Sequence, residues 1–365
     1  MRIVIDARII GSSTGRYAKK LLEELEKIDN SNEYIVILKA NKYDEYNPSA
    51  ENFKKYPVDI RDYSFDEQIK FKSILENLNA DLVHFCMPQQ PILYKGKKIC
   101  TVHDLTLLKT FNLNKNKYKY FIKQLIAKFV FKYIGYSNEF IITPSEYTKN
   151  EYIKLANVPQ DKVRVIYESG IDSEEITNVL EYKLEFDKYI LYVGQQSEYK
   201  NIKLLAKAHQ LMLNTYPNLG LVLVGNLNEE AKKNKEYFIN QGYKNIHFTG
   251  YLDDSFRNWL YKNAECYVFP SLMEGFGLPG LEAMAYNLPL ISSNASCLPE
   301  IYKNAALYFD PNDVDDLVRK LELVISNKGC RENLIKNARF LLKNYSWKKT
   351  ASDTLQLYKE ALKSD

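Results

Sequence analysis

The sequence lacks the features that define several classes of protein. Its five cysteines are odd in number, widely separated and without a C-x-x-C pair, so they indicate neither a disulfide framework nor a zinc site, and a reducing cytosol is the default expectation. No window approaches the roughly 20 consecutive apolar residues of a membrane span. No signal-peptide pattern precedes the first expected strand, Arg2–Asp6. The net charge of +4 is too small to indicate nucleic acid as a partner.

Two familiar ligand-binding patterns are also missing. No D-x-D metal motif lies at a strand end near the candidate site, and Asp253 and Asp254 are typical of helix N-termini instead. We therefore predict no metal and no other cofactor. The glycine loop Gly11–Gly15, between the first strand and the helix Arg16–Ile28, does not match G-x-G-x-x-G. By itself it is a weak signal of ligand binding.

What remains is an ordinary globular composition, with 365 residues, 45% apolar and 26% charged. This length predicts two domains, each large enough to bury its own core. Apolar runs that read as strands are followed repeatedly by segments that read as helices, as at Tyr189–Val193 and Ile202–Asn214. The segment 41–63 is polar and reads as irregular. His84, inside the short apolar run 81–85, reads mainly as a core or strand-end residue.

The most informative stretch is Ser271–Glu282, S-L-M-E-G-F-G-L-P-G-L-E. It follows an apolar run that reads as a buried strand, and it leads into a segment that reads as a helix with Pro279 in its first turn. Glycines in the turn permit a positive φ or close approach of a ligand to the backbone. Free N–H groups at such a helix start form an anion pocket at the positive end of the helix dipole.

Two carboxylates bracket this expected anion pocket. Glu274 lies where the strand ends, and Glu282 is expected in the first helical turn. Each has a plain explanation, a solvated loop acid for Glu274 and an acid that favours its own helix dipole for Glu282. Each also has a functional one, acceptance of hydrogen bonds from sugar hydroxyls, as an acid does for a ribose in dinucleotide folds.

Two further candidates lie at expected strand ends. His103 and Asp104 end the apolar strand 98–103, at the edge where α/β sheets place ligands. The alternative is an incidental histidine beside an Asp104 that caps the next helix. Lys200 follows a strand and precedes a helix, a placement that suits a point charge on a diphosphate. The alternative is a solvated lysine.

These segments together resemble the family-4 retaining glycosyltransferases, also called glycosyl transferases group 1. The resemblance rests on the E-x7-E spacing of Glu274 and Glu282, on the segment 293–301 (S-N-A-S-C-L-P-E-I), on T-V-H-D at 101–104 and on Lys200-Asn201. It implies the α/β GT-B architecture: two Rossmann-like parallel-sheet domains facing across a cleft, with a C-terminal helix that crosses back to the first domain. Tyr199 departs from the family pattern, in which an arginine is frequent.

The resemblance also implies roles for particular residues. His103 contacts the transferred sugar and stabilises charge at the reacting carbon, while Lys200 neutralises the diphosphate and Glu274 binds sugar hydroxyls. The implied catalytic residues are His103, Glu274 and Lys200. The implied donor-binding residues are Gly15, Arg16, Tyr251, Leu252, Gly275, Phe276, Gly277, Leu278 and Glu282.

The domain boundaries follow from the same resemblance. The turn Glu168-Ser169-Gly170-Ile171-Asp172 is similar to the family's N-G-[VI]-D turn, with Glu-Ser in place of Asn. We place an N-terminal acceptor-side domain at 1–170, a linker at 171–188, a C-terminal nucleotide-sugar domain at 189–345 and a terminal helix at 346–365.

The segment 112–137 has a distinct charge pattern, because its lysines have no acid between them and alternate with aromatic and aliphatic residues. A basic face opposite an aromatic face predicts contact with an anionic membrane surface. The alternative is a helix packed on the first sheet with a solvated lysine face. The protein is expected to be cytoplasmic, or peripheral at the inner face of the cytoplasmic membrane.

The function predicted from the resemblance is a retaining, metal-independent hexosyltransferase of bacterial surface polysaccharide synthesis. GDP-mannose is the first expected donor and a glycan or lipid-linked glycan the acceptor, with UDP- or dTDP-sugar transferases of the same family as the alternative. A nucleotide-sugar epimerase or phosphorylase and a non-catalytic GT-B scaffold are the competing classes. The sequence indicates no oligomeric state.

Overall fold

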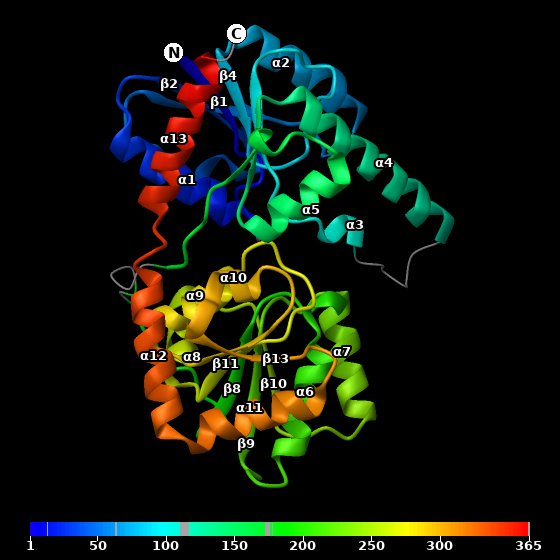
Figure 1. The fold of residues 1–365 in the computed structure, drawn as a ribbon, viewed down its shortest axis with the longest axis vertical. Coiled ribbons are helices and arrows are strands. Elements are labelled where there is room, and N and C mark those ends of the chain that lie inside the picture. The colour runs from blue at the N-terminus through cyan, green and yellow to red at the C-terminus, as the bar shows by residue number, and fades with distance from the viewer. Residues whose placement is uncertain (13, 63, 110–116, 172–175, 177, 364–365) are drawn as a thin grey trace. The chain divides into compact units, whose positions relative to one another are not determined.

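The computed structural model describes residues 1–12, 14–62, 64–109, 117–171, 176 and 178–363. These residues form two compact units. Unit 1 consists of Met1–Glu168 together with Trp347–Asp365, and unit 2 of Ser169–Ser346. Each unit contains one parallel β-sheet with helices between its strands, so each has the α/β layering expected of a Rossmann-like fold (Figure 1).

The sheet of unit 1 has the strand order β3-β2-β1-β4-β5-β6-β7. The strands are β1 (Arg2–Asp6), β2 (Glu33–Lys39), β3 (Phe53–Val58), β4 (Leu82–Phe85), β5 (Lys98–Thr101), β6 (Phe140–Thr143) and β7 (Val163–Val165). Every pair is parallel. The order reverses direction at β1, so the loops after β1 and β4 lie next to each other at the carboxyl edge of the sheet, where such folds bind ligands.

Helices cover both faces of this sheet. They are α1 (Gly15–Ile28), the π-helical turn η2 (Glu67–Phe71), α2 (Lys72–Asn77), α3 (Thr106–Lys109), α4 (Lys117–Ser137), α5 (Glu146–Ala156) and α13 (Trp347–Lys363). Figure 1 shows α1 and α13 on one side of the sheet and α2, α4 and α5 on the other. The second side packs a core that includes Val4 of β1, Phe71, Phe131 of α4 and Tyr152 of α5.

The segment 41–63 is not wholly irregular, which corrects the sequence interpretation. Strand β3 lies within it, and a 3-10 turn, η1 (Ala40–Glu45), extends into it. Lysines and Pro57 hide the strand pattern in the sequence F-K-K-Y-P-V. Because β3 pairs only with β2 and lies at the edge of the sheet, Pro57 interrupts no central ladder.

The last helix, α13, is part of unit 1 and packs against α1 and β4. Trp347 meets the ring of Tyr17 at a centroid distance of 6.5 Å, and the Thr350 hydroxyl donates to the carbonyl of Tyr167 at 2.7 Å. His84 is fully buried and its Nδ1 lies 2.7 Å from the hydroxyl of Tyr358. His84 is therefore a core residue, as predicted, and burial lowers its pKa to about 3.

The sheet of unit 2 has the strand order β10-β9-β8-β11-β12-β13. The strands are β8 (Lys188–Val193), β9 (Leu219–Val224), β10 (Ile246–Gly250), β11 (Cys266–Phe269), β12 (Leu290–Ser293) and β13 (Ala306–Phe309). The helices are α6 (Ile202–Met212), α7 (Glu229–Asn240), α8 (Asp254–Asn263), α9 (Leu278–Ala285), α10 (Leu298–Tyr302), α11 (Val314–Ser326) and α12 (Lys328–Leu342). This sheet reverses direction at β8, and the loops after β8 and β11 are therefore neighbours.

Part of the predicted linker packs on unit 2. The carbonyl of Asn178 accepts from the side chain of Asn258, and Tyr182 Oη lies 3.1 Å from His247 Nε2. His247 thus has a structural contact. Residues 172–175 and 177 of the predicted linker lie outside the described residues. Within the described part of the chain, no helix is both long and apolar enough to cross a membrane.

Candidate functional site

The loops at the carboxyl edge of unit 2 are joined by backbone hydrogen bonds. After β8 the chain runs through a 3-10 turn, η5 (Glu198–Lys200), before it enters α6. The N–H of Leu272, in the stretch after β11, donates to the carbonyl of Tyr199 in η5 at 2.8 Å. This bond brings the two loops together although they lie about seventy residues apart in the sequence.

Lys200 and Glu274 meet at this junction. The Lys200 ammonium lies 2.6 Å from a carboxylate oxygen of Glu274, with 15% and 13% of the two side chains exposed. Burial lowers the pKa of Lys200, but the Glu274 carboxylate together with Tyr192 and Tyr199 raises it, and the net pKa is above the ordinary value. Lys200 is therefore a fixed positive charge and not a freely solvated lysine, at the edge where we predicted the diphosphate.

Tyr199 has a place in the same arrangement. Its ring centroid lies 5.0 Å from the Lys200 ammonium, and the ring of Phe269 lies 5.7 Å away on the end of β11. Aromatic faces at this distance attract a cation. At the position where related sequences often carry an arginine, this chain therefore has a ring that supports the neighbouring lysine.

A second loop fixes the backbone at Glu274. The Glu274 N–H donates to the Ser296 hydroxyl at 3.0 Å, and the Ser293 hydroxyl donates to the carbonyl of Ser271 at 2.6 Å. The thiol of the buried Cys297 lies 3.4 Å from the carbonyl of Glu274. The segment 293–301 thus supports the stretch Ser271–Glu282.

The helix after the glycine turn begins at Leu278, with Pro279 in the first turn as predicted. Gly277 caps it at φ +104°, and a Cβ there would lie 2.4 Å from the hydroxyl of Tyr302. That hydroxyl donates to the carbonyl of Gly277 at 2.5 Å. The close approach that requires glycine at this position is therefore to a buried tyrosine of the same unit.

Two details of the predicted anion pocket need correction. Pro279 has no N–H, and the N–H of Gly280 donates to the carbonyl of Gly277 at 3.2 Å, so this helix start offers fewer amides than we expected. Glu282 lies in the second turn, because the helix starts at Leu278 and has no acid in its first turn. The helix-dipole explanation of Glu282 is therefore weaker than the sequence indicated.

Glu282 is nevertheless held inside unit 2. Only 7% of the residue is exposed, and the Tyr261 hydroxyl lies 3.4 Å from its Oε2. A buried carboxylate needs hydrogen-bonding partners. With Tyr261 as a partner, Glu282 is an oriented acceptor in the second turn of α9.

The remaining predicted donor residues of unit 2 lie around this edge. Gly275 is buried, and the buried Phe276 packs edge-on against Tyr345 at a ring-centroid distance of 5.7 Å. Leu278 is half-buried at the start of α9. Tyr251 is 71% exposed just after β10, and Leu252 beside it is half-buried.

His103 lies in unit 1, in the loop after β5. Its Nδ1 lies 3.1 Å from Oε1 of Glu168, and its Nε2 lies 2.9 Å from the carbonyl oxygen of Cys86. A carboxylate and a carbonyl both accept, so both contacts are hydrogen bonds only when both ring nitrogens carry protons. Burial lowers the pKa of His103, Glu168 and the Cys86 carbonyl raise it, and the net pKa is raised. The arrangement favours an imidazolium.

Three other predicted residues of unit 1 lie at the starts of helices. Asp104 accepts from the N–H of Thr106 at 2.7 Å, so it caps α3, as the alternative interpretation of this residue predicted. Gly15 is the buried first residue of α1, and Arg16 follows it, half-buried. The structure thus brings Lys200, Glu274 and the segment 293–301 together within unit 2, while His103, Gly15 and Arg16 belong to unit 1.

Sequence reasoning missed Glu168 as a site candidate. It appeared only as the residue that replaces the usual asparagine of the family's turn. That replacement was the available signal, because a carboxylate in place of an amide adds a charge that needs a partner. The partner is His103, whose Nδ1 lies 3.1 Å from Glu168. Among the described residues, no group of three or more His, Cys, Asp or Glu is placed to hold a metal ion.

Both halves of the chain match family models. Residues 14–175 match the model of Glycosyltransferase Family 4, and residues 177–340 match that of the glycosyl transferases group 1. The two matches meet close to the boundary between the two units.

Individual relatives and structures agree with these models. O-antigen chain mannosyltransferase B of Escherichia coli is 30% identical over 275 residues, which cover 72% of this chain and 70% of the relative. O-antigen chain mannosyltransferase RfbU of Salmonella typhimurium is 29% identical over 252 residues, 69% of this chain and 67% of the relative. Anabaena HepE, solved in complex with UDP and glucose, matches 98% of this chain and 99% of its own with a TM-score of 0.73 at 13% identity. The chain therefore belongs to the glycosyl transferases of group 1, and it is a glycosyltransferase with two Rossmann-like units of the GT-B type.

Proposed function

We propose that this enzyme transfers mannose from GDP-mannose to a growing bacterial surface glycan, with retention of configuration and without a metal ion. Support for the sugar comes from the O-antigen mannosyltransferases that the chain resembles at 29–30% identity. The observation that carries the proposal is the largely buried Lys200–Glu274 pair at the carboxyl edge of unit 2. It combines a cation for a diphosphate with an acceptor for sugar hydroxyls.

The proposed reaction breaks the bond between the anomeric carbon and the diphosphate oxygen and forms a bond from that carbon to an acceptor oxygen. The proton of the acceptor hydroxyl ends on the departing diphosphate. Negative charge develops on the diphosphate as its bond breaks, and a preorganised cation there lowers the barrier. Lys200 is suited to this role because its positive charge is already fixed at the site.

Glu274 acts as an acceptor of sugar hydroxyls in this proposal. With the donor bound, the Lys200 ammonium is shared between the diphosphate and Glu274, and Glu274 turns its second oxygen to the sugar. Glu282, held by Tyr261, is the corresponding acceptor for the ribose of the nucleotide. Tyr251 and Leu252 are the proposed neighbours of the base.

The role of His103 follows from its charge. An imidazolium repels the positive charge that develops at the reacting carbon, so the charge-stabilising role implied by the family resemblance does not fit the pairing with Glu168. We propose instead that His103 donates to a hydroxyl of the transferred sugar or to the departing diphosphate. Gly15 and Arg16, at the start of α1, are the proposed neighbours of the diphosphate in unit 1.

A donor screen tests the substrate. GDP-mannose is expected to raise the melting temperature and to release GDP only when an acceptor glycan is present, and chelation with EDTA is expected to leave the rate unchanged. Proton NMR of the product is expected to show the anomeric configuration of the donor. Stabilisation by UDP- or dTDP-sugars alone would contradict the proposed donor. Release of nucleotide or epimerised sugar without acceptor favours the epimerase alternative, and no turnover with any donor favours a scaffold.

We also propose that the enzyme is cytoplasmic and contacts the anionic inner face of the membrane through α4. The exposed part of α4 carries Leu125 and Phe129, but the exposed Lys128 and Lys132 lie on the same side. The predicted basic face opposite an aromatic face is therefore wrong for these residues, since lysines and apolar groups share one exposed surface. Residues 112–116 lie outside the described residues.

Neighbouring segments add to this surface. Leu93 and Ile69 are exposed, and their segments are tied to α4 through the Tyr133 hydroxyl, which donates to the carbonyl of Ile92 at 2.9 Å. The N–H of Ile92 in turn donates to Gln68 at 2.8 Å. Apolar side chains interleaved with lysines suit an interface with anionic lipid, in which the rings enter the headgroup region and the ammonium groups meet phosphates.

Vesicle sedimentation tests the membrane proposal. The protein is expected to bind vesicles with phosphatidylglycerol and not vesicles of phosphatidylcholine alone, and the double variant L125S/F129S is expected to lose most of that binding. Phe340 of unit 2 is similarly exposed at 61%, and Phe340→Ser is the matched control. Equal binding by the two variants would support the alternative, a helix with a merely solvated lysine face.

A further inference from the structure

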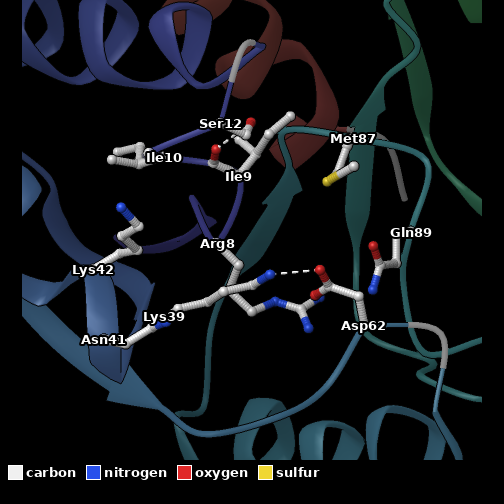
Figure 2. Close-up of a pocket in the computed structure, with 11 residues that line it drawn as sticks. Arg8, Ile9, Ile10, Ser12, Lys39, Asn41, Lys42, Asp62, Met87 and Gln89 are labelled. Atoms are coloured by element: carbon white, nitrogen blue, oxygen red, sulfur yellow. Dashed lines mark hydrogen bonds and ion pairs between the residues drawn. The ribbon is translucent and has the colours of Figure 1, made fainter. Parts of the chain in front are cut away.

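A cavity of about 240 Å³ lies at the carboxyl edge of the unit 1 sheet, outside the residues assigned to the donor (Figure 2). The ends of four neighbouring strands contribute its walls. The loop after β1 gives Arg8 to Ser12, and the end of β2 and the turn η1 give Lys39, Asn41 and Lys42. The loop after β3 gives Asp62, and the loop after β4 gives Met87 and Gln89. This edge of a parallel sheet is where such folds bind ligands. The cavity is smaller than a drug-sized pocket and has room for one small ring.

Each cation that lines the cavity already has a carboxylate partner. Arg8 is 5% exposed, and its guanidinium lies 2.8 Å from Asp6 and 2.9 Å from Glu67. Lys39 pairs with Asp62, and Lys42 lies 3.1 Å from Glu45. An anion would therefore enter a site whose positive charges are balanced, and it would meet the Asp62 carboxylate directly.

The same groups suit a neutral molecule with several hydroxyls. A hydroxyl both donates and accepts, so the adjacent ammonium and carboxylate of Lys39 and Asp62 can engage one hydroxyl or two neighbouring ones. Figure 2 shows this pair on one side of the cavity and Met87 and Ile9 on another. Apolar side chains beside paired charges match a sugar ring, which has C–H faces and a hydroxylated rim.

The position of Lys42 depends on a glycine. Gly11 has φ +81°, and a Cβ at this position would lie 2.9 Å from Cδ and 3.2 Å from Nζ of Lys42. The Lys42 side chain therefore lies directly over Gly11, where a larger residue would displace it. The glycine loop thus serves the cavity through its first glycine.

We propose that this cavity binds a neutral sugar residue of the acceptor glycan, in preference to a phosphate or another anionic group. The proposal rests on the proposed transferase function and names the chemical class of its acceptor. Lys39 and Asp62 engage ring hydroxyls, Lys42 closes the cavity over Gly11, and Ile9 and Met87 contact the apolar face of the ring.

Ligand-observed NMR on the full chain tests binding directly. Methyl α-glycosides of mannose, glucose and galactose serve as neutral probes and inorganic phosphate as the anionic one. At least one glycoside is expected to show saturation transfer from the protein, and added phosphate is expected to leave this signal unchanged. The signal is expected to disappear in Asp62→Asn and in Lys42→Met. Asp66→Asn and Lys70→Met alter an exposed ion pair of the same unit, with a Lys–Asp distance of 3.0 Å, and are the matched controls.

Kinetics separate this proposal from the proposed function. Asp62→Asn and Lys42→Met are expected to raise the KM for the acceptor on the order of tenfold, the effect of losing one charge-assisted hydrogen bond, while donor-induced thermal stabilisation persists. Displacement of the glycosides by phosphate, no glycoside binding at all, or an unchanged acceptor KM would overturn the cavity assignment and leave the donor assignment intact. If GDP-mannose does not stabilise the wild-type protein, the proposed function is contradicted. Glycoside binding still tests the cavity assignment in that case.

Discussion

The two units each contain a charged pair at the carboxyl edge of a parallel sheet, but the pairs differ in kind. Lys200 and Glu274 lie 2.6 Å apart in unit 2, and the pKa of Lys200 is raised, so this lysine stays charged at any physiological pH. His103 and Glu168 lie 3.1 Å apart in unit 1, and histidine titrates much closer to neutrality. Unit 2 thus presents a constant charge, whereas the charge of unit 1 depends on pH.

The two sites also differ in how firmly their surroundings hold them, and the site of unit 2 is held more firmly. In the stretch Ser271–Glu282, the Ser296 hydroxyl accepts from the N–H of Glu274, and the buried Tyr302 hydroxyl donates to the carbonyl of Gly277, so that both fix the backbone. At the cavity of unit 1, the side chains of Lys39 and Lys42 are about one-third exposed, and each is held by a partly exposed carboxylate only. A rigid site in unit 2 suits the single nucleotide-sugar that we propose as donor, and an adjustable cavity in unit 1 suits a varied glycan end.

The largest expected effect on the transfer rate comes from breaking the Lys200–Glu274 pair. Glu274→Gln keeps the shape of the side chain but removes the charge that holds Lys200, and it weakens acceptance of sugar hydroxyls. We expect the transfer rate to fall by about 10²- to 10³-fold, the size of a lost electrostatic contact in an active site. Initial rates of GDP release measure this effect.

The control for this prediction is Glu229→Gln, which removes an exposed partner of Lys232 in the same unit. It is expected to leave the rate within twofold of wild type, since exposed ion pairs contribute about 0–1 kcal/mol. A Glu274→Gln enzyme that is as active as this control would show that the pair is structural only.

A pair of glycine variants compares the rigidity of the two sites. Gly277→Ala places a Cβ 2.4 Å from the buried Tyr302 hydroxyl at φ +104°, and we expect the free energy of unfolding to drop by about 2–4 kcal/mol. Gly11→Ala meets only the flexible Lys42 chain, and about 1–2 kcal/mol is expected from its positive φ. Denaturant unfolding of both variants checks the order, and equal losses would contradict the contrast between the units.

The His103–Glu168 pair predicts that the stability of the protein depends on pH. The folded pKa of His103 is above its unfolded value, so its contribution to stability is complete below about pH 6.5 and is lost as pH rises through the folded pKa. The ring faces Glu168, the carbonyl of Cys86, the edge of Tyr17 and, through space, Asp104 and the neutral His84. Of these groups, Glu168 supplies the largest contribution that raises the pKa.

Glu168→Gln therefore lowers the pKa of His103, and the alkaline limb of the rate profile is expected to move to lower pH. Rates measured over about pH 6 to 9 detect this shift. Glu33→Gln, which loses an exposed ion pair with Lys54 in the same unit, is expected to keep the wild-type profile. Identical profiles for the two variants would mean that the charge of His103 does not limit the reaction.

The smallest predicted effect concerns Tyr199. Tyr199→Leu removes the ring that lies 5.0 Å from the Lys200 ammonium, and Tyr199→Phe retains it. We expect the KM for the donor to rise about two- to fivefold in the leucine variant only, because such contacts contribute about 0.5–1 kcal/mol. Equal KM values in both variants would leave the ring without a role in donor binding.

The sequence predicted the fold class and the turn after β11 well, because strand and helix patterns and the E-x7-E spacing are local features. It failed at β3, where Lys55 and Pro57 break the apolar alternation that marks a strand. It also misplaced Glu282 by one helical turn, since the start of a short helix depends on a glycine cap held by Tyr302. Neither partner of His103 was predicted, because a hydrogen bond across sixty-five residues leaves no periodic trace.

By itself, the sequence determined that this protein has two α/β halves and carries the motifs of a glycosyltransferase, since apolar periodicity and short motifs depend on residues close together in the chain. Only the tertiary structure decided which charges are paired: Lys200 with Glu274, His103 with Glu168, and Lys39 with Asp62. The physical reason is that parallel sheets bring the ends of distant strands to one edge, and burial there makes the charge of each side chain depend on its neighbours.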